Sequence, residues 1–195
     1  ISTRRGLPVV DFLKDGDILY HGSFCEVQIP DLQKCARYKD FGQGFDLTTD
    51  KKQAESFAKI STQKAVENGV VASQKYGVVS AFRYNGDAKL NIKIYGSADS
   101  AWLHCIVAHR KKDVFGDVLE DCSRYDVIGG KIANDATNST IVTYMANAFG
   151  AVGTASADDI CIRLLLPERL MNQYCFKSLA ALNQLSFMGS EQVWM

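Results

Sequence analysis

The sequence predicts an α+β fold in a single domain spanning residues 1–195. Short β-prone runs and amphipathic helical segments are mixed without a regular β-α alternation, which argues against a doubly wound parallel sheet. Only three prolines occur, Pro8, Pro30 and Pro167, and no repeat, low-complexity stretch or linker divides the chain. A chain of 195 residues is long enough to bury one hydrophobic core.

Seven strands are predicted from runs rich in β-branched and aromatic residues. The turn signal Asp15-Gly16 precedes the first run, and the glycine-bearing loop 39–44 precedes the second. The segment 90–95 alternates apolar and polar side chains in the way expected of a half-buried strand. In chain order the predicted strands are 18–21, 45–49, 78–84, 90–95, 125–128, 173–176 and one within 185–193 around 186–188.

Helices are predicted where apolar residues recur at helical spacing. Thr49 or Asp50 can cap a helix that begins near Lys51, and Gly69 is its stop signal. One apolar face of this helix is formed by Ala54, Phe57, Ala58 and Ala65. The other predicted helical segments are 99–109, 141–149, 157–166 and the short turn 179–182.

Charge and cysteine content restrict the class of protein. The 22 Lys and Arg residues balance 22 Asp and Glu residues, so the whole chain carries no basic footprint for nucleic acid. The six cysteines form no C-x-x-C pair and predict no metal site. They fit small buried hydrophobes in a reducing cytoplasm, with three disulfides in an oxidising compartment as the alternative. Apolar runs are too short for a membrane span or export signal, so we expect a cytoplasmic protein without a membrane partner.

Two glycine-containing motifs could contact a ligand. His21-Gly22-Ser23 ends a strand, where an imidazole can hydrogen-bond a ligand hydroxyl and a glycine allows close approach; a surface turn is the alternative. Gly42-x-Gly44 precedes a strand and an amphipathic helix, but it is neither a P-loop nor a G-x-G-x-x-G motif. A hairpin-like turn explains it equally well.

Two further features are less specific alone. Asp46 and Phe57 stand eleven residues apart, one on a predicted strand and one on a predicted helix. Periodicity alone places Phe57 in the core. Asn172-Gln173 opens the strand 173–176, where polar side chains commonly satisfy loop backbone groups.

Together these motifs resemble the ADP-ribosyltransferase superfamily, which includes poly-ADP-ribose polymerases and diphtheria toxin. There a strand ends in His-Gly-Ser or His-Gly-Thr, a Gly-x-Gly-aromatic-Tyr segment precedes a helix with a second aromatic, and a catalytic Glu opens a later strand. The matching stretches here are Tyr20–Ser23, Gly42–Leu47 with Phe57, and Asn172–Phe176. Other phrases resemble a family of small bacterial proteins of this kind, often regarded as toxins of toxin–antitoxin pairs: Leu19–Ser23, Asp40–Gly42, Leu47–Lys51, Tyr125–Gly129 and Phe187–Glu191.

The resemblance covers about residues 15–193 and implies two packed, mostly antiparallel sheets with flanking helices and NAD folded between them. It implies that His21 bonds the adenine-side ribose, the Gly22 backbone holds the nicotinamide carboxamide, and Phe57 stacks on the nicotinamide ring. The implied NAD-binding residues are His21, Gly22, Ser23, Gly44, Phe45, Thr48 and Phe57. The implied catalytic residues are His21, Asp46 and Gln173, with no metal.

Two positions depart from the superfamily pattern. Asp46 stands where a tyrosine is usual, which removes one wall of the nicotinamide site. Gln173 stands where many transferases have Glu, and its neutral amide can bond ribose hydroxyls but stabilises an oxocarbenium-like transition state less than a carboxylate. Asp126 and Glu191 are the other carboxylates considered for this role.

The function that follows is an NAD-dependent mono-ADP-ribosyltransferase, a bacterial toxin neutralised by an antitoxin protein, with activity impaired by Asp46. The sequence leaves the acceptor of ADP-ribose open: it can be a protein, a nucleic acid or a small molecule. The alternative is an inactive module that binds NAD or ADP-ribose. A third reading is a protein-interaction domain with a vestigial cleft.

Overall fold

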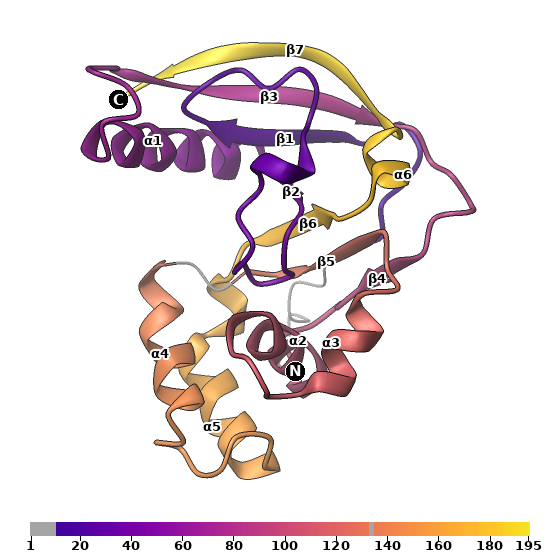
Figure 1. Cartoon of the computed structure of the whole chain (residues 1–195), viewed down its shortest axis with the longest axis vertical. Coiled ribbons are helices and arrows are strands. Elements are labelled where there is room, and N and C mark those ends of the chain that lie inside the picture. The colour runs from indigo at the N-terminus through magenta and orange to yellow at the C-terminus, as the bar shows by residue number, and fades with distance from the viewer. Residues whose placement is uncertain (1–10, 133–134) are drawn as a thin grey trace, which may run out of the picture.

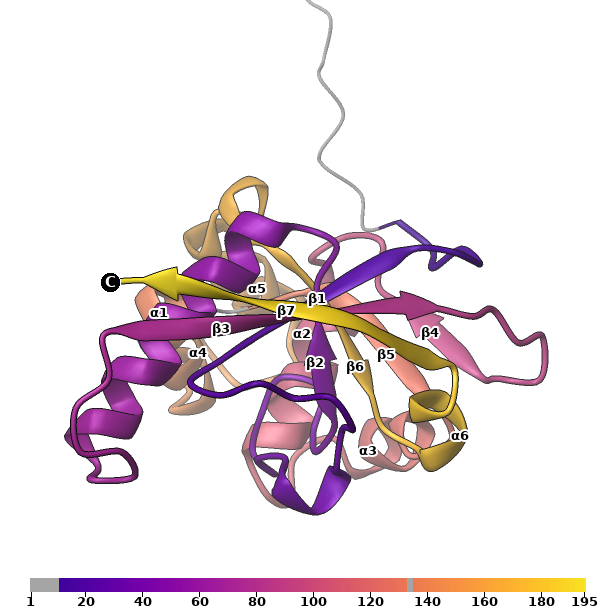
Figure 2. The same ribbon diagram turned by 90° about the horizontal axis from the view of Figure 1, so that it is seen from above.

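Two β-sheets form the framework of the chain in the computed structural model, which describes residues 11–132 and 135–195 (Figure 1). The strands are β1 (Ile18–Ser23), β2 (Phe45–Leu47), β3 (Tyr76–Tyr84), β4 (Ile92–Ile94), β5 (Val127–Lys131), β6 (Asn172–Phe176) and β7 (Leu185–Trp194). One sheet has the order β1-β3-β7, with antiparallel pairs. The other has the order β2-β6-β5-β4, in which β4 runs parallel to β5 and the other pairs are antiparallel. Figure 2 shows the strands of the first sheet crossing over those of the second.

Helices pack against both sheets. They are α1 (Lys51–Glu67), α2 (Ser100–Arg110), α3 (Gly116–Cys122), α4 (Asp135–Met145), α5 (Ala155–Leu165) and α6 (Leu179–Leu182). Figure 1 shows α1 on the side of the three-stranded sheet that faces the four-stranded sheet, and α2 to α5 gathered beyond the four-stranded sheet. The α+β prediction is therefore confirmed. Among the helices of residues 11–132 and 135–195, none is both long enough and apolar enough to cross a membrane.

The ends of the helices follow from their capping residues. Asp50 accepts hydrogen bonds from the backbone N–H groups of Lys52 and Gln53, so it caps α1 as one of the two predicted residues. Asp99 caps α2 through Trp102 N in the same way. The remaining predicted elements differ from the structure mainly in their bounds, because helix and strand ends are the least well specified features of a sequence.

Three parts of the secondary structure were predicted wrongly or missed. The short helix α3 was not predicted, and α4 begins at residue 135 where the helix was expected to begin at 141. β5 was expected to end before Gly129-Gly130 but runs through both glycines. A Cβ at Gly129 would lie 2.7 Å from the Tyr174 ring, and one at Gly130 would lie 2.9 Å from the Phe41 ring. These glycines therefore let two aromatic rings pack directly on the strand.

Two of the three apolar clusters among the described residues share β5. Val127 belongs to the cluster between the two sheets, whose other members include Leu19, Phe45, Phe82 and Phe176. Ile128 points to the opposite face, as strand alternation requires, and packs with Trp102 and Ile106 of α2. Four of the six cysteines are buried and all six are free thiols, in keeping with their prediction as small hydrophobes.

Helix α1 lies unusually close to the three-stranded sheet. A Cβ built at Gly22 of β1 would stand 2.0 Å from the carbonyl oxygen of Ala54, and one at Gly77 of β3 would stand 2.5 Å from that of Ala58. Ala54 and Ala58 are themselves completely buried. The helix therefore rests on the sheet through two glycines and two alanines, which leave no room for larger side chains.

The two sheets are hydrogen-bonded to each other at one isolated bridge. Tyr20 of β1 donates its N–H to Thr48 O at 2.8 Å, and Thr48 donates to Tyr20 O at 3.0 Å. Thr48 directly follows β2, so the bridge brings the end of β1 beside the second sheet. We call this region the sheet junction and define it by Tyr20–Ser23, Asp46–Thr48 and Asn172–Gln173.

Candidate functional site

His21 occupies the centre of the sheet junction. Its Nδ1 donates a hydrogen bond to the carbonyl oxygen of Asp46 at 2.8 Å, and its ring lies 4.3 Å from that of Phe45. Burial lowers the pKa of His21, so the ring is held neutral. Since Nδ1 carries the proton, Nε2 is the acceptor, and it has no hydrogen-bond partner in the described part of the chain. A ligand hydroxyl could therefore donate to His21 Nε2.

The neutral state of His21 gives a pH dependence of stability. The pKa of His21 is lower in the folded protein than in the unfolded chain. Its contribution to stability is therefore complete above about pH 6.5 and is lost as the pH falls below that value. We expect the melting temperature to be lower at about pH 5.5 than at about pH 7.5, and the difference to shrink in His21→Gln. Burial also lowers the pKa of His109, so this residue accounts for the pH dependence of the melting temperature that remains in His21→Gln. Equal pH slopes in wild type and His21→Gln would contradict this assignment.

Asp46 is held in an ion pair that the sequence did not indicate. Its Oδ2 lies 2.7 Å from Lys39 Nζ, and its side chain is 11% exposed. Asp46 raises the pKa of Lys39, which stays charged. The other oxygen, Oδ1, is buried without an N–H or O–H donor and has the weakly donating thiol of Cys175 beside it. Asp46 therefore does not offer a free carboxylate to a ligand in this arrangement.

A buried glutamine links the strands at the junction. Thr48 Oγ1 donates to Gln53 Oε1 at 2.9 Å, and Gln53 Nε2 donates to Asn172 O at 3.0 Å. Gln53 is 3% exposed, and the neighbouring Asn172 Oδ1 is buried without a partner. Sequence reasoning missed Gln53. Its position beside Ala54 on the helix face that meets the sheet was the available signal.

Gln173 and Ser23 are the other polar groups that the junction leaves available. Gln173 lies opposite Gly130 near the start of β6, and Ser23 lies opposite Val78 at the end of β1. Both are partly exposed, and neither side chain has a hydrogen-bond partner among the residues described. The junction thus offers an imidazole nitrogen, an amide and a hydroxyl, all uncharged.

Four of the expected ligand residues have structural roles. α1 fills the space beside Gly22, and a Cβ at Gly44 would meet the Cys175 sulfur at 2.4 Å. Phe45 is buried between the sheets and contacts Phe82 edge-on. Thr48 is buried and uses its backbone and hydroxyl groups to join β1, β2 and α1.

The remaining expected residues lie in different places. Phe57 of α1 is half-buried and packs against the core beneath the four-stranded sheet. Asp126 accepts a hydrogen bond from Asn91 N at 2.9 Å, and Glu191 pairs with Lys51 at 2.8 Å. These two carboxylates are therefore engaged elsewhere.

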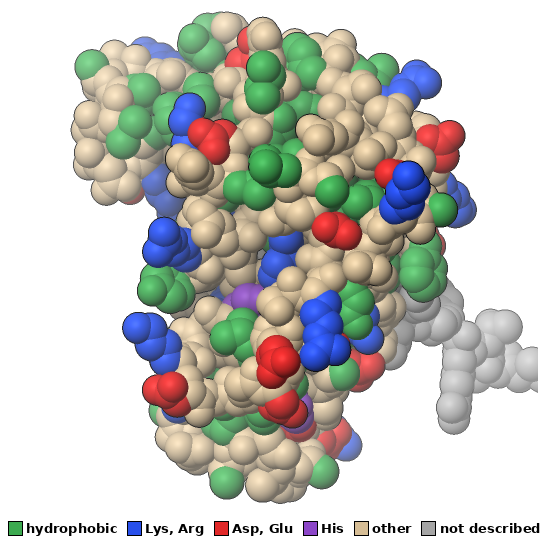
Figure 3. Space-filling model, turned by 45° about the vertical axis from the view of Figure 1, so that its right-hand side comes forward, with side chains coloured by type: hydrophobic (Ala, Val, Ile, Leu, Met, Phe, Trp, Pro, Cys, Tyr) green, Lys and Arg blue, Asp and Glu red, His purple; other side chains and the backbone are tan. Residues whose placement is uncertain are grey.

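A cationic pocket of about 590 Å³ lies on the other side of the loop that leads into β2. Figure 3 shows a hollow with a histidine side chain inside it and Lys and Arg side chains around it. The lining includes His109, Lys177, Arg37, Lys112 and Arg124. Asp126 is the acidic residue in the lining, and Arg110 is paired with Asp40. Arg37 and Lys112 have no ion-pair partner within the described ranges, so they can attract an anion.

Fold and junction together define an α+β domain whose two sheets meet at a polar site beside a cationic pocket. Residues 18–187 match the family described as "Protein of unknown function (DUF3990)", and the chain belongs to this family. The match begins at the first residue of β1 and includes the whole sheet junction. Comparison with curated proteins found no match, and comparison with solved structures found none either.

Proposed function

We propose that this protein is an NAD-dependent mono-ADP-ribosyltransferase with an ADP-ribosyltransferase-like fold, acting as a toxin that an antitoxin protein neutralises. The observation that carries the proposal is the sheet junction, where His21 Nε2 and the Gln173 amide are both without partners. Two sheets meeting at a strand-end His-Gly-Ser match the motif order of that superfamily.

The proposed reaction breaks the bond between the nicotinamide nitrogen and ribose C1′. The electron pair leaves with nicotinamide, and a nucleophile of the acceptor bonds C1′ and loses its proton. Positive charge develops on the ribose, and a nearby negative or dipolar group stabilises it. Gln173 supplies only a dipole, and Lys39 neutralises Asp46. Slow turnover is therefore expected of this sequence.

We expect Gln173→Glu and Asp46→Tyr each to raise nicotinamide release from NAD by about tenfold or more, because they restore a carboxylate and an aromatic wall. Labelled NAD, incubated with cell lysate and each purified variant, measures both nicotinamide release and transfer to an acceptor. His21→Asn in either background should remove the gain.

The control for these variants is Asp159→Asn on the exposed face of α5, whose carboxylate pairs only with Arg163 in the described ranges. It should leave nicotinamide release unchanged. The transferase proposal fails if neither restored variant releases nicotinamide although both remain folded by their melting temperatures.

A second candidate is a module that binds NAD or ADP-ribose without turnover. The cationic pocket favours it, since about 590 Å³ is within the usual range for small-molecule sites and Arg37 and Lys112 could meet a pyrophosphate. Calorimetric titration with ADP-ribose should then give binding that weakens about tenfold in the Arg37→Ala, Lys112→Ala double variant. Binding that this variant leaves unchanged would exclude the pocket.

The toxin role has its own test. Expression of the Asp46→Tyr chain in bacteria should arrest growth, and co-expression of an antitoxin protein that binds the chain should restore it. Arrest that persists in Asp46→Tyr with His21→Asn would show that the effect does not depend on the junction.

A further inference from the structure

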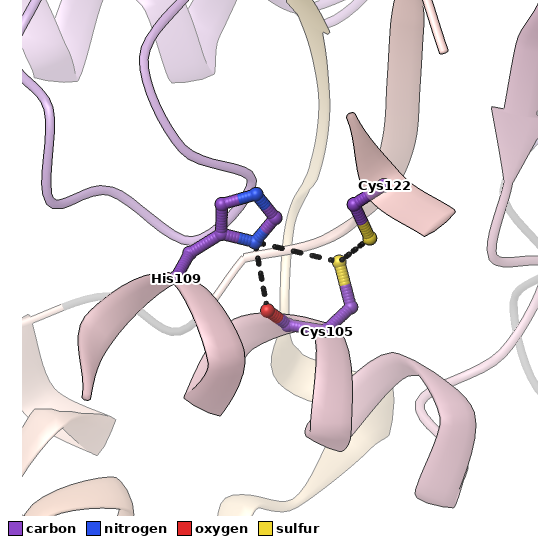
Figure 4. Close-up of side chains that lie close together, drawn as sticks. All are labelled: Cys105, His109 and Cys122. Carbon is purple, nitrogen blue, oxygen red and sulfur yellow. Dashed lines mark hydrogen bonds between the residues drawn. The ribbon is translucent and has the colours of Figure 1, made fainter. Parts of the chain in front are cut away.

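Three side chains outside the sheet junction place soft ligand atoms together (Figure 4). Cys105 and His109 come from α2, and Cys122 is the last residue of α3. The two sulfur atoms are 3.3 Å apart, and Cys105 Sγ lies 3.8 Å from His109 Nδ1. All three ligand atoms are within 4.8 Å of one another. Both thiols are completely buried, whereas His109 reaches the cationic pocket.

The fold creates this cluster in two steps. Cys105 and His109 are four residues apart, so they share one face of α2. Packing of α3 against α2 then brings Cys122 over that face. A cluster formed between two helices has no C-x-x-C signature, which is why the sequence predicted no metal site.

We propose that Cys105, His109 and Cys122 form a binding site for a soft divalent metal ion of the zinc type. Two thiolates and a neutral imidazole are a preferred donor set for this metal, and their charges cancel that of Zn²⁺, as a buried site requires. Binding releases the two thiol protons to solvent. The fourth ligand is a water molecule or an anion that enters from the pocket beside His109.

Two of the three edges between the ligand atoms are close to those of tetrahedral coordination, and the third must shorten when the metal binds. Zinc–sulfur bonds of about 2.3 Å and zinc–nitrogen bonds of about 2.0–2.1 Å imply edges of about 3.8 Å between sulfurs and about 3.5 Å between sulfur and nitrogen. The observed values are 3.3 Å and 3.8 Å. The third edge, between Cys122 Sγ and His109, lies within 4.8 Å, so the Cys122 and His109 side chains must rotate to shorten it by up to about 1.3 Å.

His109 must exchange one hydrogen bond to serve as a ligand. Its Nδ1 now donates to Cys105 O at 2.8 Å, and its Nε2 faces Lys177 Nζ at 3.3 Å. Cys105 O keeps its place in the backbone bonding of α2 when Nδ1 binds metal. Lys177, which also bonds Phe41 O at 2.7 Å, would have to turn from the newly protonated Nε2.

The surroundings help to form the thiolates. The two thiols are hydrogen-bonded to each other with their sulfur atoms 3.3 Å apart, so both already point toward the same place. Both thiols lose their protons when the metal binds. Lys177 favours both thiolates, and the Tyr95 hydroxyl lies 3.9 Å from Cys122 Sγ.

Titration of the fully reduced protein with Co²⁺ tests the site. We expect the visible absorption bands of tetrahedral thiolate-bound Co²⁺, saturating at one ion per chain and displaced by Zn²⁺. Cys105→Ala and Cys122→Ala should weaken binding by more than about a hundredfold, and His109→Gln by about tenfold or more. Cys161→Ala is the matched control, because Cys161 is equally buried but lies on α5 outside the cluster.

Alkylation of the unaltered protein gives a second readout that does not depend on the folding of variants. Zn²⁺ should protect Cys105 and Cys122 from slow alkylation, mapped by mass spectrometry, while the exposed Cys25 reacts equally with and without metal. The proposal is overturned if reduced protein shows no thiolate–Co²⁺ bands, if Cys161→Ala weakens binding as much as Cys105→Ala, or if Zn²⁺ protects neither cysteine.

Discussion

Gly22→Ala is expected to lower the free energy of unfolding by about 3 kcal/mol, at the upper end of the cost of overpacking. The new methyl group would stand 2.0 Å from Ala54 O and 2.7 Å from Ala58 N. Both atoms belong to the backbone of α1, so no side chain can rotate away and the helix must move from the sheet. Urea unfolding followed by circular dichroism measures the change.

Gly116→Ala is the matched control for this substitution. Gly116 is exposed at the start of α3, and a Cβ there would meet no atom within 4 Å. The free energy of unfolding should stay within about 1 kcal/mol of wild type and should rise if it changes, since alanine favours helix. Gly77 faces the same helix from β3, so Gly77→Ala should cost less when added to Gly22→Ala than alone, because one shift of α1 relieves both clashes. Equal stabilities of Gly22→Ala and Gly116→Ala would refute the close contact.

Asp158→Ala is expected to have a similarly large effect, about 3 kcal/mol or more. The Asp158 carboxylate on α5 is 2% exposed and accepts hydrogen bonds from His104 Nε2 at 2.7 Å and from the Tyr144 hydroxyl. Tyr144 is completely buried on α4, so the side chain ties α2, α4 and α5 together. Its loss leaves a cavity and takes one hydrogen-bond partner from the buried Tyr144 hydroxyl and one from the partly exposed His104.

The neighbouring Asp159→Ala is the control. Asp159 pairs with Arg163 one helical turn away, and both side chains are more than half exposed. Its loss should change the free energy of unfolding by about 0.5 kcal/mol or less. A double-mutant cycle between Asp158→Ala and Tyr144→Phe should give a coupling of about 1 kcal/mol or more. Similar losses for Asp158→Ala and Asp159→Ala would contradict a buried network.

Much of the fold could be predicted from local patterns. The strand 18–21, the cap of the long helix and the mixed α+β order depend on residues close in sequence, and the structure contains all three. The sequence did not predict α3 for two reasons. Its N-cap residue, Phe115, has a left-handed backbone conformation and no capping side chain, and the seven residues of the helix are too few to show a clear period. The second half of β5 was not predicted, because glycine is uncommon within strands and the prediction ended the strand before Gly129.

The candidate site was predictable only in part. The motif His21-Gly22-Ser23 was correctly placed at a strand end. Its glycine, however, makes room for the helix α1 that packs on the strand. The ion pair between Lys39 and Asp46 joins residues that are seven positions apart in the sequence. The hydrogen bond from Gln53 to Asn172 joins residues that are 119 positions apart. Contacts of this kind depend on the assembled fold, which no local pattern encodes.

The bridge between Tyr20 and Thr48 has a consequence for how the two sheets can be followed in solution. Each residue donates its amide hydrogen to the other, so both amides are shielded by bonds that cross from one sheet to the other. Their hydrogen–deuterium exchange is therefore governed by separation of the sheets, while amides such as that of Val79 within β3 report on opening of a sheet itself. A ligand seated between β1 and β6 would slow the first pair selectively and leave the second unchanged.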